Sequence, residues 1–221
     1  MNEYLQASPV INWRHPAVLE RAQQIAFAQQ SAVTTSQAGQ NTVSKASQTE
    51  RLAKSCFEWV RDQITHSVDA QMNPVTCCAS DVLKHRTGYC FAKSHLLAAL
   101  LRANNIPAGF CYQRLSLNDQ GAPYCLHGFN AVYLEAFGWY RLDPRGNREG
   151  INAQFTPPQE QLAYATTLAG EVDFDGILAE PLPKVVKILE AHQTWDQALQ
   201  NIPDLSPAQG KLHGLSPAPK P

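Results

Sequence analysis

Hydrophobic positions recur with a helical period in three stretches of the chain, residues 16–29, 49–64 and 90–104. In the last stretch, small and aliphatic residues form a stripe that starts at Cys90 and ends at an Asn-Asn-Ile-Pro sequence, which is typical of a helix end. Residues 30–48 are polar, small and aperiodic, so they predict a flexible connection between the first two helices.

The pattern changes after the Ile-Pro sequence. Residues 108–117, 125–135 and 139–143 are rich in aromatic and alternating apolar positions, as strands are. Turn residues separate them at 118–121 and 136–138. A long helix followed by at least three strands with short connections predicts an antiparallel sheet in an α+β fold.

The remaining segments are expected to surround this core. A C-terminal helix begun by Pro183 follows, and residues 216–221 form a Pro-rich tail with no core to join. We therefore expect a single domain overall. It consists of a helical extension and polar loop (1–48), the α+β core (49–165) and a helical wrap with the tail (166–221).

The overall composition is that of a globular protein. Of the 221 residues, 44% are hydrophobic and 17% are charged, which allows a sizeable core in one domain. The net charge is −1 without a long Lys/Arg run, which argues against nucleic-acid binding. The longest apolar run, residues 96–101, is too short to span a bilayer, and the N-terminal residues do not resemble a secretory signal. We expect a cytoplasmic protein with no nucleic-acid or membrane partner.

Six cysteines require an explanation: Cys56, Cys77, Cys78, Cys90, Cys111 and Cys125. In a long chain without a signal, reduced thiols are expected rather than a disulfide framework. Zinc ligands are usually paired two to four residues apart. Cys77 and Cys78 are adjacent and no second spaced pair exists, so we expect no metal. Most of these thiols are expected to be small buried hydrophobic groups.

Cys90 differs because it opens the strongest predicted helix. The unpaired N–H groups and the positive end of the helix dipole favour a thiolate at this position. The same N–H groups can donate hydrogen bonds to an oxyanion that forms on an attacked carbonyl. A buried structural cysteine that happens to precede a helix is the alternative.

A thiol nucleophile needs a base, and the base needs an orienting partner. His127 lies in an otherwise apolar strand, and Asp143 ends the strand that returns beside it, so a hairpin brings the two close. A carboxylate beside the imidazole Nδ1–H would fix the tautomer and stabilise the imidazolium. The alternatives are a core histidine bonded to a carbonyl and a turn-initiating aspartate before Pro144.

Together these segments resemble a known family. TGYCFAKSHLLAALLRANNIPAGF resembles the catalytic-cysteine motif of the transglutaminase-like superfamily, a Gly-x-Cys that opens a Leu-rich helix ended by Ile-Pro. LHGFNAVYLEAFGWYRLDPRGN is similar to the histidine and aspartate strands of that family, and CFEWVRDQITHSVD and ASDVLKHR resemble the segments that precede the cysteine. His127 follows Cys90 by 37 residues and Asp143 follows His127 by 16, which suits small bacterial-type members. Where the family commonly has His-x-Trp or a similar aromatic, this chain has His127-Gly128-Phe129.

The resemblance covers about residues 50–147 and implies a papain-like core, with the cysteine helix packed on an antiparallel sheet. It implies that Cys90 is the nucleophile, His127 the general base and acid, and Asp143 the orienting residue of a bacterial-type transglutaminase-like cysteine protease. The implied reaction is acyl transfer from an amide of a peptide or protein substrate through a thioester. Hydrolysis is expected over cross-linking, and no cofactor is expected. A second oxyanion donor upstream is also implied. His66 is one candidate, although it can equally be a surface histidine at a helix end.

Two other classes stay open. The chain can be a non-catalytic peptide-binding module with the same fold, which the reactivity of Cys90 toward iodoacetamide would reveal. A redox protein based on Cys77 and Cys78 is less favoured, because adjacent cysteines form a disulfide only with difficulty and no Cys-x-x-Cys is present. The substrate, the acceptor and the oligomeric state are not readable from the sequence.

Overall fold

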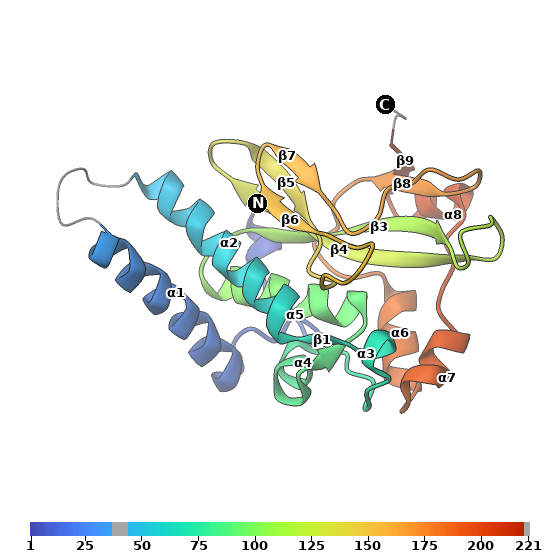
Figure 1. The fold of residues 1–221 in the computed structure, drawn as a ribbon, viewed down its shortest axis with the longest axis horizontal. Helices are drawn as coiled ribbons and strands as arrows, with labels where there is room; N and C mark the ends of the chain where they lie inside the picture. The colour runs from blue at the N-terminus through green and yellow to red at the C-terminus, as the bar shows by residue number, and fades with distance from the viewer. Residues whose placement is uncertain (37–43, 219–221) are drawn as a thin grey trace.

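The computed structural model describes residues 1–36 and 44–218 (Figure 1). A five-stranded antiparallel sheet forms one layer, and most of the helices lie on one side of it (Figure 1). The central helix α5 (Cys90–Ala103) packs against the sheet through β3 and β4, and α1, α2 and α4 pack against α5. The predicted α+β class is confirmed.

The first helices are longer than the hydrophobic pattern suggests. Helix α1 spans Pro16–Ser36 and α2 spans Lys45–Gln63, so the flexible connection predicted over residues 30–48 is wrong at both ends. Residues 37–43 of that prediction lie outside the described part of the chain. The hydroxyl of Ser44 accepts a hydrogen bond from the Ser47 N–H and caps α2. None of residues 45–48 at the start of α2 is buried, so no apolar stripe marks this end in the sequence.

Helix α5 is buried on almost all sides, whereas its sequence predicts a single apolar stripe. Every residue from Cys90 to Arg102 is buried, including Lys93, Ser94 and His95. The buried polar groups find partners. The Ser94 hydroxyl donates to Cys90 O at 2.8 Å, and His95 Nδ1 lies 2.8 Å from the Cys77 carbonyl oxygen. The helix is therefore the centre of the core, and α4 (Ala79–His85) is one of the elements that cover it.

The sheet has the strand order β5-β4-β3-β8-β9. The three predicted strands are confirmed as β3 (Ala108–Ser116), β4 (Tyr124–Leu134) and β5 (Gly138–Leu142), all antiparallel. Their register pairs Gln113 with His127 and Asn130 with Leu142. Asp143 therefore follows the end of β5, close to the part of β4 that carries His127.

The C-terminal part adds strands as well as helices. Strand β8 (Val172–Asp175) pairs with β3, and β9 (Ser216–Pro217) pairs with β8. The prediction that the tail joins no core is thus wrong at residues 216–217, because backbone pairing needs no apolar side chain. Residues 219–221 of the tail lie outside the described part of the chain. The expected domain boundaries stay a prediction.

The predicted C-terminal helix begins at Pro183 but is interrupted. Helix α6 spans Pro183–Ala191, and α7 spans Trp195–Gln200 after an extended His192. A third short helix, α8 (Pro207–Leu212), follows. No helix within the described residues is long and apolar enough to cross a membrane.

Short elements complete the fold. They are the 3₁₀ turn Asn2–Leu5, β1 (Thr65–His66), α3 (Ser67–Ala70), β2 (Thr87–Gly88), β6 (Gln154–Thr156) and β7 (Gln159–Gln161). Strands β1 and β2 pair in parallel and place His66 opposite Gly88, two residues before Cys90. This pairing brings the segment around His66 to the start of α5.

Candidate active site

Cys90 is the first residue of α5, after an extended Tyr89 in the capping position. Its side chain is nearly buried, with 6% of the residue exposed. It lines a cavity of about 460 Å³ together with His66, His127, Arg145 and others. The expected position of Cys90 in the first turn of a helix thus agrees with the structure. Because the first N–H groups of a helix have no partner within it, this position offers donors next to the sulfur.

His127 and Asp143 form a buried pair. The imidazole Nε2 lies 2.7 Å from Asp143 Oδ2, and the residues are 4% and 0% exposed. The backbone N–H groups of Arg145 and Ala163 donate to Asp143 Oδ1 and Oδ2 at 3.0 and 3.2 Å. These bonds fix the carboxylate in position. The expectation that the carboxylate meets Nδ1 is wrong, because the ring presents Nε2 to Asp143. Nδ1 is therefore the nitrogen left for Cys90.

The protonation of His127 follows from its two partners. Burial disfavours the imidazolium, but the negative charges of Asp143 and Cys90 and hydrogen bonds to both raise the pKa of His127 to about 10. His127 thus carries its proton at neutral pH. A charged imidazole between a sulfur and a carboxylate is the arrangement that an acid–base catalyst beside a thiol requires.

Two aromatic rings hold the His127 imidazole, and the sequence pointed to Phe129 but not to Tyr164. Phe129 stacks against it at 5.9 Å between centroids, and Tyr164 stands edge-on at 5.0 Å. Phe129 lies two residues along the same strand, so strand periodicity places it on the same face. Tyr164 comes from the segment after β7, and no local pattern identifies it.

His66 lies in the same cavity but has a different environment. Its Nδ1 is 3.7 Å from Asp69 Oδ1 and is buried without a hydrogen-bond partner among the described residues. Burial, together with the positive charges of Arg145, Lys93 and His127, lowers the pKa of His66 well below its ordinary value despite Asp69. His66 is therefore neutral at pH 7. The candidate residue from sequence analysis does reach the cavity and is not a surface histidine.

Arg145 binds the Asp69 carboxylate that lies beside His66. Its Nη1 and Nη2 donate to Asp69 Oδ2 and Oδ1 at 2.6 and 2.9 Å. Arg145 is 4% exposed, and its charge is neutralised by this two-point contact. Sequence analysis did not single out Arg145, although it follows Asp143 by two residues in the LDPRGN segment.

Lys93 connects the start of α5 to the end of α2. It is fully buried, and its Nζ donates to the carbonyl oxygens of Arg61, at 3.2 Å, and Ile64. Burial, with the nearby Arg145, lowers the pKa of Lys93 to about 7 against the opposite effect of Asp143. The side chain ties the segment before β1, and with it His66, to the helix that Cys90 opens.

Gly128 allows α5 to lie directly on β4. A Cβ atom at this position would come within 2.6 Å of Phe91 Cδ1 and 3.3 Å of Tyr112 Cε1. The Gly128 carbonyl oxygen accepts a hydrogen bond from Ser94 at 3.2 Å. The first turn of α5 therefore meets the strand at the residue next to His127.

The other cysteines form no disulfide in the structure. Burial raises the pKa of Cys56, Cys77, Cys111 and Cys125 to about 12, so these four are thiols at neutral pH. Cys77 and Cys78 remain unpaired, as separate thiols. Within residues 1–36 and 44–218, no group of three or more His, Cys, Asp or Glu side chains can hold a metal ion.

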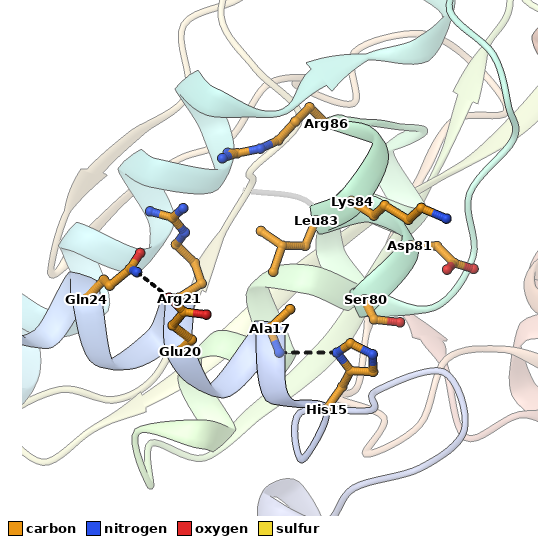
Figure 2. Close-up of a pocket in the computed structure, with 10 residues that line it drawn as sticks. All are labelled: His15, Ala17, Glu20, Arg21, Gln24, Ser80, Asp81, Leu83, Lys84 and Arg86. Atoms are coloured by element: carbon orange, nitrogen blue, oxygen red, sulfur yellow. Dashed lines mark hydrogen bonds between the residues drawn. The ribbon is translucent and has the colours of Figure 1, made fainter.

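A second cavity, of about 590 Å³, lies between α1 and α4 (Figure 2). Its ten labelled lining residues include His15, Arg21, Asp81 and Lys84, but no cysteine (Figure 2). Arg21 and Arg86 both lie over the Trp59 ring at 4.9 Å, so they support packing between the helices. The cavity beside Cys90, by contrast, is lined by a thiol and by the charged imidazole that the buried Asp143 carboxylate holds.

A family profile described as the transglutaminase-like superfamily matches residues 36–144. This stretch contains Cys90, His127 and Asp143. The match to the transglutaminase-like superfamily therefore covers the candidate site.

Solved structures are similar to the chain at low identity. A proposed cysteine protease from Cytophaga hutchinsonii is 18% identical, with a TM-score of 0.42, over 64% of this chain and 40% of its own. The periplasmic domain of TgpA from Pseudomonas aeruginosa is also 18% identical, with a TM-score of 0.40, over 64% of this chain and 45% of its own. The chain spans less than half the length of these two structures. A comparison with curated proteins finds no match.

Proposed function

We propose that this protein is a cysteine enzyme that cleaves or transfers amide acyl groups of peptides or proteins through a thioester on Cys90. Hydrolysis is the favoured outcome. The observation that carries the proposal is the Cys90–His127–Asp143 arrangement, in which a buried carboxylate holds Nε2 at 2.7 Å and a charged imidazole faces the sulfur. The alternative is a peptide-binding module with the same fold, for which a charged His127 has no obvious use.

In the first half of the reaction, the Cys90 thiolate attacks the amide carbonyl carbon and forms a C–S bond. The oxyanion that develops accepts hydrogen bonds from N–H groups at the start of α5. His127, held by Asp143, donates its proton to the amide nitrogen. The C–N bond then breaks, the amine leaves, and a thioester remains beside a neutral imidazole.

In the second half, His127 takes a proton from water or from an acceptor amine as that nucleophile attacks the thioester carbon. The C–S bond breaks and releases an acid or a new amide, and the thiolate and the imidazolium are restored. Neutral His66 is positioned in the same cavity to supply a second hydrogen bond to the oxyanion. A neutral imidazole suits this task because its N–H donates a hydrogen bond but is not acidic enough to protonate the thiolate.

The test is amide turnover by wild-type protein and by Cys90→Ala. Incubation with a peptide library and mass spectrometry of the products distinguishes cleavage, deamidation and amine incorporation. We expect turnover by wild type, and none by Cys90→Ala at an unchanged melting temperature, because a small residue at a helix start contributes little to packing.

Cys56→Ala provides a matched control, since it removes another buried thiol outside the cavity. Labelling of Cys90 by iodoacetamide at neutral pH is expected as well. A folded Cys90→Ala protein that still turns over substrate would exclude thioester chemistry. An inert Cys90 without turnover in wild type would favour the binding module.

A further inference from the structure

The cavity beside Cys90 continues along a wall of aliphatic side chains. Leu117, Leu168, Leu199 and Ile202 line this wall, and they come from three separate parts of the chain. Leu117, after β3, is 46% exposed, and the other three are half-buried. We call these four residues the aliphatic wall.

Three charged groups in the lining of the cavity already have partners within the protein. The Glu171 carboxylate accepts hydrogen bonds from the N–H groups of Ser116, Thr167 and Leu168, all at 2.9 Å. Arg145 and Asp69, which also line the cavity, neutralise each other through two short contacts. These three charged groups are therefore already engaged within the protein.

What the wall does offer is apolar surface that water still reaches. Binding of an aliphatic group would remove this surface from water on both partners, which is favourable in proportion to the area buried. A charged group placed here would lose its hydration without a new partner. The wall thus discriminates between aliphatic and charged side chains.

We propose that the aliphatic wall is a subsite for a Leu- or Ile-sized side chain of the substrate, in a residue beside the scissile amide. This inference rests on the proposed function, because it identifies the substrate class of the same site. It goes beyond it because acyl transfer through Cys90 requires no particular side chain on the substrate.

The experiment is a leucine scan through an alanine hexapeptide, with cleavage followed by mass spectrometry. We expect a peptide with leucine beside the cleaved bond to have a kcat/KM about 10- to 100-fold above the all-alanine peptide. Serine or aspartate at the same position should give no gain. The position of the preferred leucine relative to the cut identifies the side of the bond that the wall contacts.

Two variants test the wall itself. Leu199→Ala and Leu117→Asp should each lower the ratio of kcat/KM for the leucine peptide to kcat/KM for the all-alanine peptide about tenfold. Leu117 is largely exposed, so Leu117→Asp keeps the proposal testable if Leu199→Ala unfolds. Ile188→Ala is the matched control, since Ile188 is a half-buried aliphatic residue of α6 outside the cavity.

A parallel binding measurement separates the two proposals. The affinities of Cys90→Ala for the leucine and all-alanine peptides report on the wall without chemistry. Turnover without leucine preference, or a preference that both wall variants leave intact, overturns the subsite. Absence of all turnover overturns the proposed function. The ratio of the affinities of Cys90→Ala for the leucine and all-alanine peptides then still decides whether the subsite exists.

Discussion

Two histidines of one cavity are both largely shielded from water, yet His127 is charged at neutral pH and His66 is not. His127 is 4% exposed, and the His66 side chain is 10% exposed. The pKa of His127 is raised to about 10, whereas that of His66 is lowered well below its ordinary value. Burial pushes both in the same direction, so it cannot explain the difference.

The difference lies in how each neighbouring carboxylate is engaged. Asp143 faces His127 at 2.7 Å and otherwise accepts only neutral backbone N–H groups. Asp69 is 3.7 Å from His66 and is already bound at both oxygens by Arg145. A carboxylate raises the pKa of a histidine only to the extent that no nearer cation neutralises it. The comparison supports a proton-carrying role for His127 and a neutral donor role for His66.

The largest expected effect is the loss of turnover when the imidazole of His127 or of His66 is removed. His127→Ala should lower kcat on the order of 10⁴- to 10⁶-fold, because the leaving amine then receives no proton. His66→Ala should cost about 10²-fold, as the loss of one oxyanion donor does. His66→Gln keeps an N–H group and should recover part of that loss. Similar losses at both positions, in proteins with unchanged melting temperatures, would contradict the division of roles.

Asp143→Asn should have the next largest effect. It should lower kcat by up to about 10⁴-fold when the tautomer of His127 is reversed. It also removes the charge that raises the pKa of His127. The alkaline limb of the kcat/KM profile, expected near pH 10 in wild type, should therefore move to lower pH. The measurement is a pH–rate profile of both proteins. An unmoved alkaline limb would mean that His127 does not control it.

Arg145→Met sharpens the comparison by freeing Asp69. The pKa of His66 should rise, because a positive charge that lowers it is removed and a carboxylate beside it becomes available. NMR titration of the imidazole resonances measures this, with His127 as the internal reference. Arg148→Met is the matched control, since Arg148 is mostly exposed and 3.7 Å from Asp69. It should move the pKa of His66 much less.

The smallest expected effect is on stability. The raised pKa of His127 contributes stability that is fully present below about pH 6.5 and is lost as the pH rises through about 10. The lowered pKa of His66 acts in the other direction, because stability is lost as the pH falls below about 6.5 and the buried ring must take a proton. His127→Gln should therefore lower the melting temperature by a few degrees more at pH 6 than at pH 10.5. Thermal unfolding monitored by circular dichroism checks this, and an equal decrease at both pH values would argue against the charged pair.

Part of the fold and of the candidate site was predictable from the sequence because it is encoded locally. Local periodicity and short turns predict helix α5 and the three strands. They also predict where Cys90, His127 and Asp143 lie on these elements. These features are encoded within about sixty residues of chain. The structure pairs His127 with Asp143 and places Cys90 and His127 in the lining of one cavity. Their catalytic role remains a proposal.

Other features depend on contacts between distant segments, which a single sequence does not display. The two-residue parallel pairing that brings His66 to the start of α5 has no periodicity to detect. Tyr164 reaches His127 from an irregular segment, and β9 joins the sheet through backbone bonds alone. Which nitrogen of His127 meets Asp143 depends on the rotation of one ring, which the register of the hairpin does not determine.

Gly128 has a consequence for how such a site can change during evolution. Because a methyl group would come within 2.6 Å of Phe91 Cδ1, a replacement must displace the Phe91 ring or the first turn of α5 that carries it. Phe91 follows Cys90 directly, so such a change acts next to the sulfur while it leaves Cys90, His127 and Asp143 in the sequence. We expect a relative with a larger residue at this position to keep all three residues and to place them differently. The absence of a side chain at one position is as informative about activity as the presence of the three reactive ones.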